Sequence, residues 1–244
     1  MPAQTRIIHY YVCLGAAGGK EWKVNMLLEV DIYKKLSEFD LDVHFKINEI
    51  CLGVMGPSGS GKSMTLKCIA GIETPDSGRI VIDGRVLYDS DQHINLSPQE
   101  RNIGYMFQNY ALFPNMTVYD NIASPLVARR LDKTTIHDSV IQLMKELHIE
   151  GLEKRYPRQL SGGQKQRVAL ARLLIYNAEA ILLDEPFSAL DEDLKRELLK
   201  EMKTKLDAYH RPVVFVSHNK DEIKTLSHEM DIIKKGGMIH EEIS

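Results

Sequence analysis

A segment of eight residues has the composition of a loop that binds phosphate groups. It runs Gly56, Pro57, Ser58, Gly59, Ser60, Gly61, Lys62 and Ser63, which matches the pattern GxxxxGK[ST]. Glycines let backbone N–H groups turn toward phosphate oxygens, and a helix that begins there adds its positive dipole. An apolar run at 49–55 precedes the segment, and apolar residues at helical spacing follow it. The segment therefore predicts a nucleotide phosphate loop, in which Lys62 reaches the β- and γ-phosphates and the Ser63 hydroxyl ligates Mg²⁺.

Two adjacent carboxylates, Asp184 and Glu185, follow another apolar run at 181–183. A strand there would deliver Asp184 beside the phosphate loop, where its carboxylate can hold Mg²⁺ through water. Glu185 would then be placed to polarise a water molecule for in-line attack on the γ-phosphate. A solvated pair of carboxylates is the alternative for such a pair alone, but the phosphate loop elsewhere in the chain favours the catalytic interpretation.

The segment Leu160, Ser161, Gly162, Gly163 and Gln164 precedes a second stretch of helical spacing. Its serine and glycine N–H groups predict another anion-binding helix start. One chain does not need two such starts for one nucleotide. We therefore expect a two-fold dimer in which each site uses this segment of the other chain. A plain N-cap after a glycine-rich loop is the alternative.

The elements that position these residues follow from the hydrophobic pattern. Alternating residues predict antiparallel strands at 26–32 and 41–47, and a hairpin over 79–87 that turns at Asp83-Gly84. Buried strands and helices then alternate. We expect strands at 49–55, 103–107, 180–184 and 212–217 and on both sides of 236–237, and helices at 134–148, 162–176, 191–208 and 220–226. This alternation predicts a largely parallel α/β core. A helical block over about 114–157 interrupts it.

Composition excludes several classes of protein. Of the 244 residues, 43% are hydrophobic and 27% are charged, which argues against collagen-like, disordered and disulfide-scaffold chains. The net charge of −3 lends no support to a duplex-DNA binder. Cys13, Cys51 and Cys68 form no CxxC pair, so we expect reduced, buried thiols. No apolar run approaches the roughly 18–20 residues of a membrane-spanning helix.

The chain divides into an N-terminal extension and one domain. Residues 6–17 have a weak likeness to a signal peptide, but His9 interrupts the apolar part. We expect residues 1–25 to be a poorly ordered extension. Residues 26–240 are predicted to form a single domain, with the helical subdomain at about 114–160.

Taken together, these motifs resemble the ATP-binding cassette (ABC) ATPase family over about 26–238. Further features in the family's order are Gln108 after an apolar strand, the run Ser188-Ala189-Leu190-Asp191, and Ser217-His218. The resemblance implies a P-loop NTPase core with a mostly parallel sheet, an antiparallel β subdomain and an inserted α-helical subdomain. It also implies ATP and Mg²⁺ as ligands and a head-to-tail homodimer. In that family Gln108 would sense Mg²⁺ and the attacking water, Asp191 would tune the dimer contact, and His218 would grip the γ-phosphate.

The sequence departs from the family at the adenine. Most cassettes stack adenine on an aromatic residue just after the first strand, where this chain has Leu36. Phe39 is one substitute, and an aliphatic contact is the other.

Finer resemblance points to importers. The segments 84–89, 95–101, 104–108 and 111–118 look like those of ATPase subunits for molybdate, tungstate or sulfate uptake. Such a subunit would lie on the cytoplasmic face of the membrane, bind integral-membrane permease subunits and serve a solute-binding protein indirectly; we expect no nucleic-acid partner. The alternatives are an importer ATPase for another small solute and a soluble ABC protein that acts on ribosomes or DNA.

The segment from Asn109 to Asn121 is rich in apolar residues, namely Tyr110, Leu112, Phe113, Met116, Val118 and Tyr119. In the family it resembles, this region lines the groove that receives a short cytoplasmic helix of the permease. Packing within the subdomain's own core is the alternative for the same residues.

Overall fold

The computed structural model describes residues 27–48, 51–188, 190 and 192–241 of the chain. The predicted extension at 1–25, and with it Cys13, lies outside the described residues, as does Asp191. The strands are β1 (Leu28–Lys35), β2 (Asp40–Ile47), β3 (Cys51–Met55), β4 (Ser77–Ile82), β5 (Arg85–Asp89), β6 (Ile94–Asn95), β7 (Ile103–Met106), β8 (Ala180–Asp184), β9 (Val213–Ser217), β10 (Glu229–Lys234) and β11 (Gly237–Glu241). The helices are α2 (Lys62–Ala70), α3 (Pro98–Arg101), α4 (Val118–Ala128), α5 (Lys133–Glu146), the 3-10 turn η2 (Pro157–Gln159), α6 (Gly162–Ile175), α7 (Glu192–Asp207) and α8 (Lys220–Leu226).

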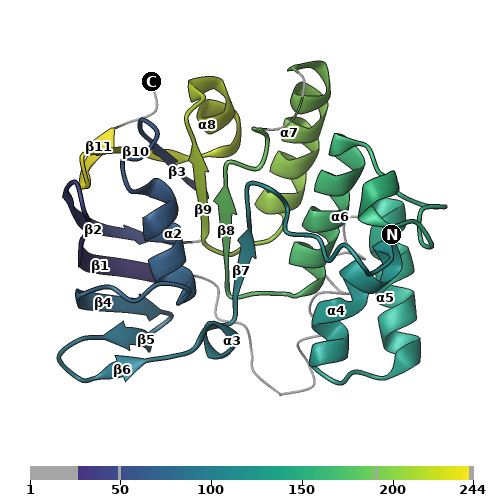
Figure 1. Cartoon of the computed structure of the whole chain (residues 1–244), viewed down its shortest axis with the longest axis horizontal. Helices are drawn as coiled ribbons and strands as arrows, with labels where there is room; N and C mark the ends of the chain where they lie inside the picture. Colours follow the sequence, from purple (N-terminus) through teal and green to yellow (C-terminus); the bar gives the residue numbers. More distant parts are fainter. Residues whose placement is uncertain (1–26, 49–50, 189, 191, 242–244) are drawn as a thin grey trace.

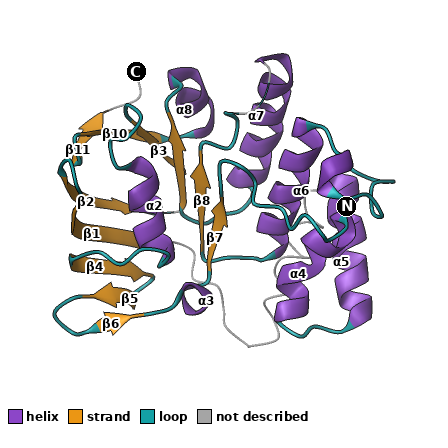
Figure 2. Ribbon diagram, in the orientation of Figure 1, coloured by secondary structure: helices purple, strands orange, loops and turns teal. Residues whose placement is uncertain are grey.

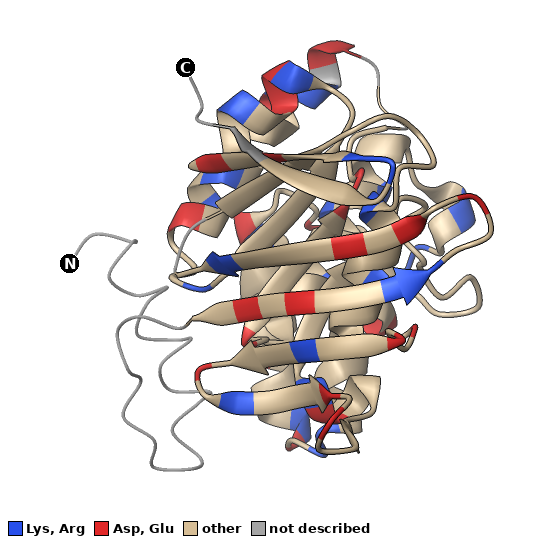
Figure 3. Ribbon diagram, turned by 90° about the vertical axis from the view of Figure 1, so that its left-hand side faces the viewer, with Lys and Arg blue, Asp and Glu red and all other residues tan. Residues whose placement is uncertain are grey.

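The strands form one sheet with two parts, in the order β6-β5-β4-β1-β2-β11-β10-β3-β9-β8-β7. The pairs β10–β3, β3–β9, β9–β8 and β8–β7 are parallel, whereas β1, β2, β4, β5 and β6 pair antiparallel. The parallel part occupies the centre of Figure 1 and the antiparallel part its left side. Figure 3 shows charged residues, both acidic and basic, along the antiparallel strands.

Helices cover both faces of the parallel part (Figure 2). Alternate residues of β8 show how, because successive side chains of a strand point to opposite faces. Leu182 packs in the cluster that contains α2, while Ile181 and Leu183 pack in the cluster that contains residues of α4, α5, α6 and α7. All three leucine and isoleucine side chains are fully buried. The strand therefore holds both layers of the core and places its last residue at a fixed position.

The structure confirms most of the predicted elements. β8 and α8 have the predicted bounds, and the predicted hairpin turns at Asp83 and Gly84, which both have positive φ. The block over 114–157 contains α5, which lies within two residues of the helix predicted at 134–148, and α4, which the hydrophobic pattern did not predict. Pro125 lies inside α4, and Thr117 caps its start in a reciprocal pair with Asp120.

Cys51 and Cys68 are buried free thiols, as expected. Burial raises the pKa of Cys51 to about 12 and that of Cys68 to about 11. Both groups therefore stay protonated at neutral pH and act as small hydrophobic side chains.

Candidate active site

Four parallel strands end at one edge of the sheet, and a candidate functional segment follows each of them. Met106 pairs with Leu183, Asp184 with Val216, and Met55 with Ser217. Ligands of open α/β sheets bind at the carboxyl ends of the strands. This register brings the segments that follow β3, β7, β8 and β9 together, although they are spread over more than half of the chain.

The predicted phosphate loop joins β3 to α2. Gly59 and Gly61 have φ values of 78° and 107°, which L-residues with a side chain rarely adopt. The Lys62 side chain turns back over the loop, and its ammonium donates to the carbonyls of Gly56 and Pro57 at 2.9 Å each. Burial lowers the pKa of Lys62, while the charges of Glu185 and Asp184 oppose that shift. The ammonium is thus held inside the loop, 5% exposed, at the place where phosphate would lie.

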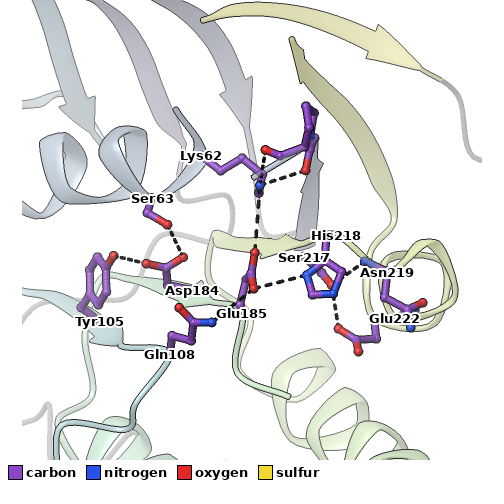
Figure 4. Close-up of polar contacts among 12 residues, drawn as sticks. Lys62, Ser63, Tyr105, Gln108, Asp184, Glu185, Ser217, His218, Asn219 and Glu222 are labelled. Atoms are coloured by element: carbon purple, nitrogen blue, oxygen red, sulfur yellow. Dashed lines mark hydrogen bonds and ion pairs between the residues drawn. The ribbon is translucent and has the colours of Figure 1, made fainter. Parts of the chain in front are cut away.

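Asp184 ends β8 and is held from two sides (Figure 4). Ser63 Oγ donates to its Oδ1 at 2.8 Å, and Tyr105 Oη donates to its Oδ2 at 2.9 Å. The carboxylate is buried. Burial, followed by the neighbouring charge of Asp184, raises the pKa of Tyr105, so its phenol remains a donor. A hydroxyl and a carboxylate side by side are the hard oxygen ligands that Mg²⁺ prefers.

Glu185 lies between Lys62, Gln108 and His218. Its Oε1 is 4.0 Å from Lys62 Nζ, and its Oε2 is 3.3 Å from His218 Nδ1 and 3.5 Å from Gln108 Nε2. The backbone of Glu185 has φ 45°, in the left-handed region that non-glycine residues seldom occupy and that is common at functional sites. Its carboxylate is 17% exposed. It is therefore close to the loop and still reachable by water.

A second layer of polar contacts fixes the segment that carries His218. Ser217 Oγ donates to Glu222 Oε2 at 2.7 Å and accepts from the backbone N–H of Asn219 at 3.0 Å. The other oxygen of Glu222, Oε1, forms an ion pair with Lys195 Nζ of α7 at 3.2 Å. The His218 ring itself is 60% exposed. The residues on both sides of His218 are thus held by hydrogen bonds, while its own ring remains exposed.

The other predicted anion site is not brought to this edge. Ser161 Oγ accepts from the N–H of Gln164 at 3.3 Å, and Gln164 Oε1 accepts from the N–H of Ser161 at 3.0 Å. Gly162 is exposed and Gly163 is buried at the same helix start. Within the described ranges, no recorded hydrogen bond or ion pair joins 161–164 to 56–63. Asp191, the other predicted dimer residue, lies outside the described residues.

Phe39 lies beside the phosphate loop, whereas Leu36 packs against the core of the sheet. The two residues close a turn in which the N–H of Leu36 donates to the carbonyl of Phe39 at 3.1 Å. A Cβ placed on Gly61 would lie 3.5 Å from the Phe39 ring. The half-buried ring thus borders the loop at the side of the antiparallel strands.

A groove of about 460 Å³ lies between β7, the segment after Gln108, α4 and α6. The apolar residues of that segment divide. Tyr110 and Val118 are buried in the core, while Phe113 and Met116 are 46% and 40% exposed. Arg172 of α6 lines the groove, donates to the carbonyls of Tyr110 and Ala111, and lies 5.2 Å from the Phe113 ring. Core packing therefore accounts for Tyr110 and Val118, whereas Phe113 and Met116 leave apolar surface exposed.

Three side chains near the site carry contacts that motif spacing does not identify. These are Tyr105, Glu222 and Lys195. Tyr105 could have been found from the sequence, because it lies near the end of a predicted strand that pairs with the strand ending at Asp184. Glu222 has a weaker one, since it lies four residues after His218 on a helix.

Comparisons with known proteins agree with this geometry. A family model described as "ABC transporter" matches residues 40–188. The molybdate/tungstate import ATP-binding protein WtpC of Methanocaldococcus jannaschii is 42% identical over 219 residues, which are 89% of this chain and 69% of that protein. The chain belongs to the ABC transporter family and is an ATP-binding cassette ATPase.

Other relatives carry sulfate names. The sulfate/thiosulfate import ATP-binding protein CysA of Thermosynechococcus vestitus is 42% identical over 84% of this chain, which spans only 58% of that protein. A probable sulfate/thiosulfate import ATP-binding protein of Chlorella vulgaris is 41% identical over 88% of this chain and 90% of its own length.

A solved structure confirms the ABC ATPase fold. The dimeric post-hydrolysis state of the ATP-binding cassette MJ0796, bound to ADP and Pi, matches with a TM-score of 0.71 and 27% identity. The match covers 88% of this chain and 98% of that one. The predicted P-loop core with its mixed sheet is therefore correct.

Among the described residues, no cluster of three or more His, Cys, Asp or Glu side chains could hold a metal ion. None of the helices there has both the length and the apolar character to cross a membrane.

Proposed function

We propose that this chain is the ATP-hydrolysing motor subunit of an ABC importer. The observation that carries the proposal is the convergence of Lys62, Gln108 and His218 on the Glu185 carboxylate. Its catalytic unit spans residues 26–240, with the helical subdomain at about 114–160. The named import function of its relatives supports the direction of transport.

ATP binds with its phosphates in the loop from Gly56 to Ser63. Lys62 presents its charge to the β- and γ-phosphates, and backbone N–H groups at the start of α2 complete the cradle. Ser63 and Asp184 would hold Mg²⁺, and Gln108 would contribute its amide oxygen; these hard oxygen donors fit the ion. When bound, Mg²⁺ neutralises charge on the β- and γ-phosphate oxygens. The adenine base stacks on the ring of Phe39, since the position where most cassettes have an aromatic residue is occupied by Leu36.

Hydrolysis is a matter of positioning and charge. Glu185 accepts a proton from the attacking water, which Gln108 orients. The His218 ring, anchored through Ser217, contacts the γ-phosphate. Lys62 stabilises the charge that develops there.

A second copy of the chain completes each site. Ser161, Gly162, Gly163 and Gln164 of one chain face the γ-phosphate held by the other, and Asp191 adjusts the contact. The dimeric state of the matched cassette supports the pairing of two copies.

The groove is the surface that receives the permease. A short apolar helix would fit there in the way that amphipathic helices occupy hydrophobic grooves. The subunit would then lie on the cytoplasmic face of the membrane. The solute is a small oxyanion such as molybdate, tungstate or sulfate, as the names of the relatives support; another small solute is the alternative.

Changing Phe113 tests the importer assignment. Because the ring is 46% exposed, Phe113→Ala should leave the melting temperature and the ATPase rate of the free subunit unchanged. It should weaken recovery of the subunit with its permease in membranes. Ile72→Ala, an equally exposed residue away from the groove, is the matched control.

Two outcomes would contradict the docking surface. One is normal recovery with the permease. The other is a large drop in melting temperature, which would assign Phe113 to the core instead. If the chain instead recovers with ribosomes or DNA and not with membranes, the soluble alternative holds.

A further inference from the structure

Tyr105 makes a contact that the proposed catalytic roles do not use. Its hydroxyl donates to Asp184 Oδ2 at 2.9 Å, while Ser63 Oγ occupies Oδ1 at 2.8 Å. Figure 4 shows the two donors, each bonded to a different oxygen of the one carboxylate. Ser63 belongs to the phosphate loop and is a ligand candidate itself. Tyr105 belongs to β7 and lies behind the carboxylate.

The ring of Tyr105 is held in place independently of its hydroxyl. Its centroid lies 4.3 Å from that of the Phe107 ring, and Tyr105 packs against the core cluster that contains residues of α2. β7 pairs in parallel with β8, with Tyr105 opposite Leu182. The phenol is therefore aimed at Asp184 before any ligand binds, and the hydrogen bond requires little further ordering of the side chain.

We propose that Tyr105 is a positioning residue for the metal: its hydroxyl fixes Asp184 Oδ2 so that Oδ1 faces Ser63 and the Mg²⁺–nucleotide. This inference rests on the proposed nucleotide site. A carboxylate that accepts a bond on one oxygen cannot rotate freely about its last torsion. Without the hydroxyl, Oδ2 is left in a buried place with one partner fewer, and the carboxylate can turn away from Ser63.

The expected effect is on metal affinity. Removing a hydrogen-bond partner of a metal-ligating group commonly costs 10–100-fold in affinity or activity. Asp184 is expected to act partly through water, so we expect about tenfold, the lower end of that range. Binding of nucleotide without metal should not change, because Tyr105 contacts the carboxylate and not the phosphate loop.

The test uses the full chain with Mn²⁺ as the probe. Electron paramagnetic resonance would measure Mn²⁺ affinity in the presence of a saturating non-hydrolysable ATP analogue. For Tyr105→Phe we expect Mn²⁺ to bind about tenfold more weakly, with the analogue's affinity in EDTA unchanged. Steady-state hydrolysis should need about tenfold more Mg²⁺ and regain its normal kcat at saturating Mg²⁺.

Tyr110→Phe is the matched control. Its ring is buried on the same segment, and its hydroxyl has no hydrogen-bond partner within the described part of the chain. It should bind Mn²⁺ as the unchanged chain does. Tyr105→Met also lacks the hydroxyl but fills the space differently, so it must show the same loss if the hydroxyl is responsible.

Equal Mn²⁺ affinity in Tyr105→Phe and the unchanged chain would overturn the inference but would not contradict the proposed nucleotide site. A loss in Tyr105→Met alone also overturns it, because packing would then be the cause. If the unchanged chain binds neither the analogue nor Mn²⁺, the proposed nucleotide site fails, and the inference fails with it.

Discussion

Replacing Glu185 by Gln separates ATP binding from ATP hydrolysis. The two side chains have the same shape, but an amide cannot take a proton from the attacking water. General-base catalysis contributes typically about 10²- to 10⁴-fold, or about 2.7–5.4 kcal/mol of the barrier at 1.36 kcal/mol per factor of ten. We therefore expect kcat to fall by at least about 100-fold.

The structure also sets the sign of the effect on binding. Glu185 Oε1 lies 4.0 Å from Lys62 Nζ, so the carboxylate attracts the ammonium that is needed for phosphate. Two unit charges at that distance interact by about 4 kcal/mol at an effective dielectric constant of 20, and 17% exposure of the carboxylate lowers this figure. The neutral amide removes this competition and one negative charge near the γ-phosphate. ATP should bind as well as before or up to about tenfold more tightly.

Three measurements decide the matter. Phosphate release gives kcat, calorimetry gives ATP affinity, and light scattering detects the ATP-bound dimer, which should accumulate. Glu150→Gln, at an exposed position after α5, is the control for the charge change. A kcat for Glu185→Gln within a few fold of the unchanged chain would refute the role of Glu185 as base. Weaker ATP binding would refute the charge argument.

Three further changes test other parts of the molecule. Lys62→Ala should weaken ATP binding by at least tenfold in calorimetry, since charge-assisted bonds to phosphate contribute about 1.5–3 kcal/mol; equal affinity would contradict the phosphate loop. Phe39→Ala should weaken ATP binding about tenfold, as base–aromatic stacking contributes about 1–3 kcal/mol, yet leave tripolyphosphate binding unchanged; equal losses for both ligands would argue against stacking. Arg101 is fully buried and donates to the carbonyls of Cys68 and Ile69 at the end of α2. Arg101→Met should therefore lower the free energy of unfolding by about 3 kcal/mol and the melting temperature by about 6–12 °C, and a shift under 2 °C would contradict it.

The parallel core could be predicted because its strands are buried on both faces. Residues 180–184 and 213–217 are continuous apolar runs between helices, and such runs have few other interpretations. The polar residue at the end of each strand is then placed by the register alone. For this reason Asp184 and Glu185 were predicted to lie near the phosphate loop, and the structure places Asp184 2.8 Å from Ser63 Oγ and Glu185 4.0 Å from Lys62 Nζ. His218 was expected at the site from the family resemblance, and its ring lies 3.3 Å from Glu185.

The helical block was harder to predict because several of its signals conflict. Pro125 argues against a helix through its position, yet it is the eighth of the eleven residues of α4. A proline there cannot donate to the carbonyl of Asn121, and the Ser124 hydroxyl donates to that carbonyl instead, at 2.9 Å. The apolar residues at 110–119 serve both the core and the groove, and periodicity does not separate these uses. Only the tertiary packing shows that Val118 is buried while Phe113 is exposed.

Contacts between side chains from distant segments also could not be predicted. The bond from Tyr105 to Asp184 joins residues 79 apart, and Arg101 reaches carbonyls 32 and 33 residues away. Both depend on side-chain direction in the folded sheet. A sequence motif does not show in which direction a hydroxyl points, or which carbonyls at the end of a helix lack a partner within that helix.

The exposure of the site itself argues that one chain is incomplete. Hydrogen bonds and charges stabilise a developing transition state best where water is excluded. In the single chain the His218 ring is 60% exposed and Gln108 is exposed as well, while Lys62 and Asp184 are already buried. The residues proposed to contact phosphate and Mg²⁺ are thus already buried, whereas the residues proposed to contact the attacking water and the γ-phosphate are still exposed to solvent. The second copy that we propose would cover this open side, and its exposed helix start at Ser161 and Gly162 would bring backbone N–H donors to the γ-phosphate.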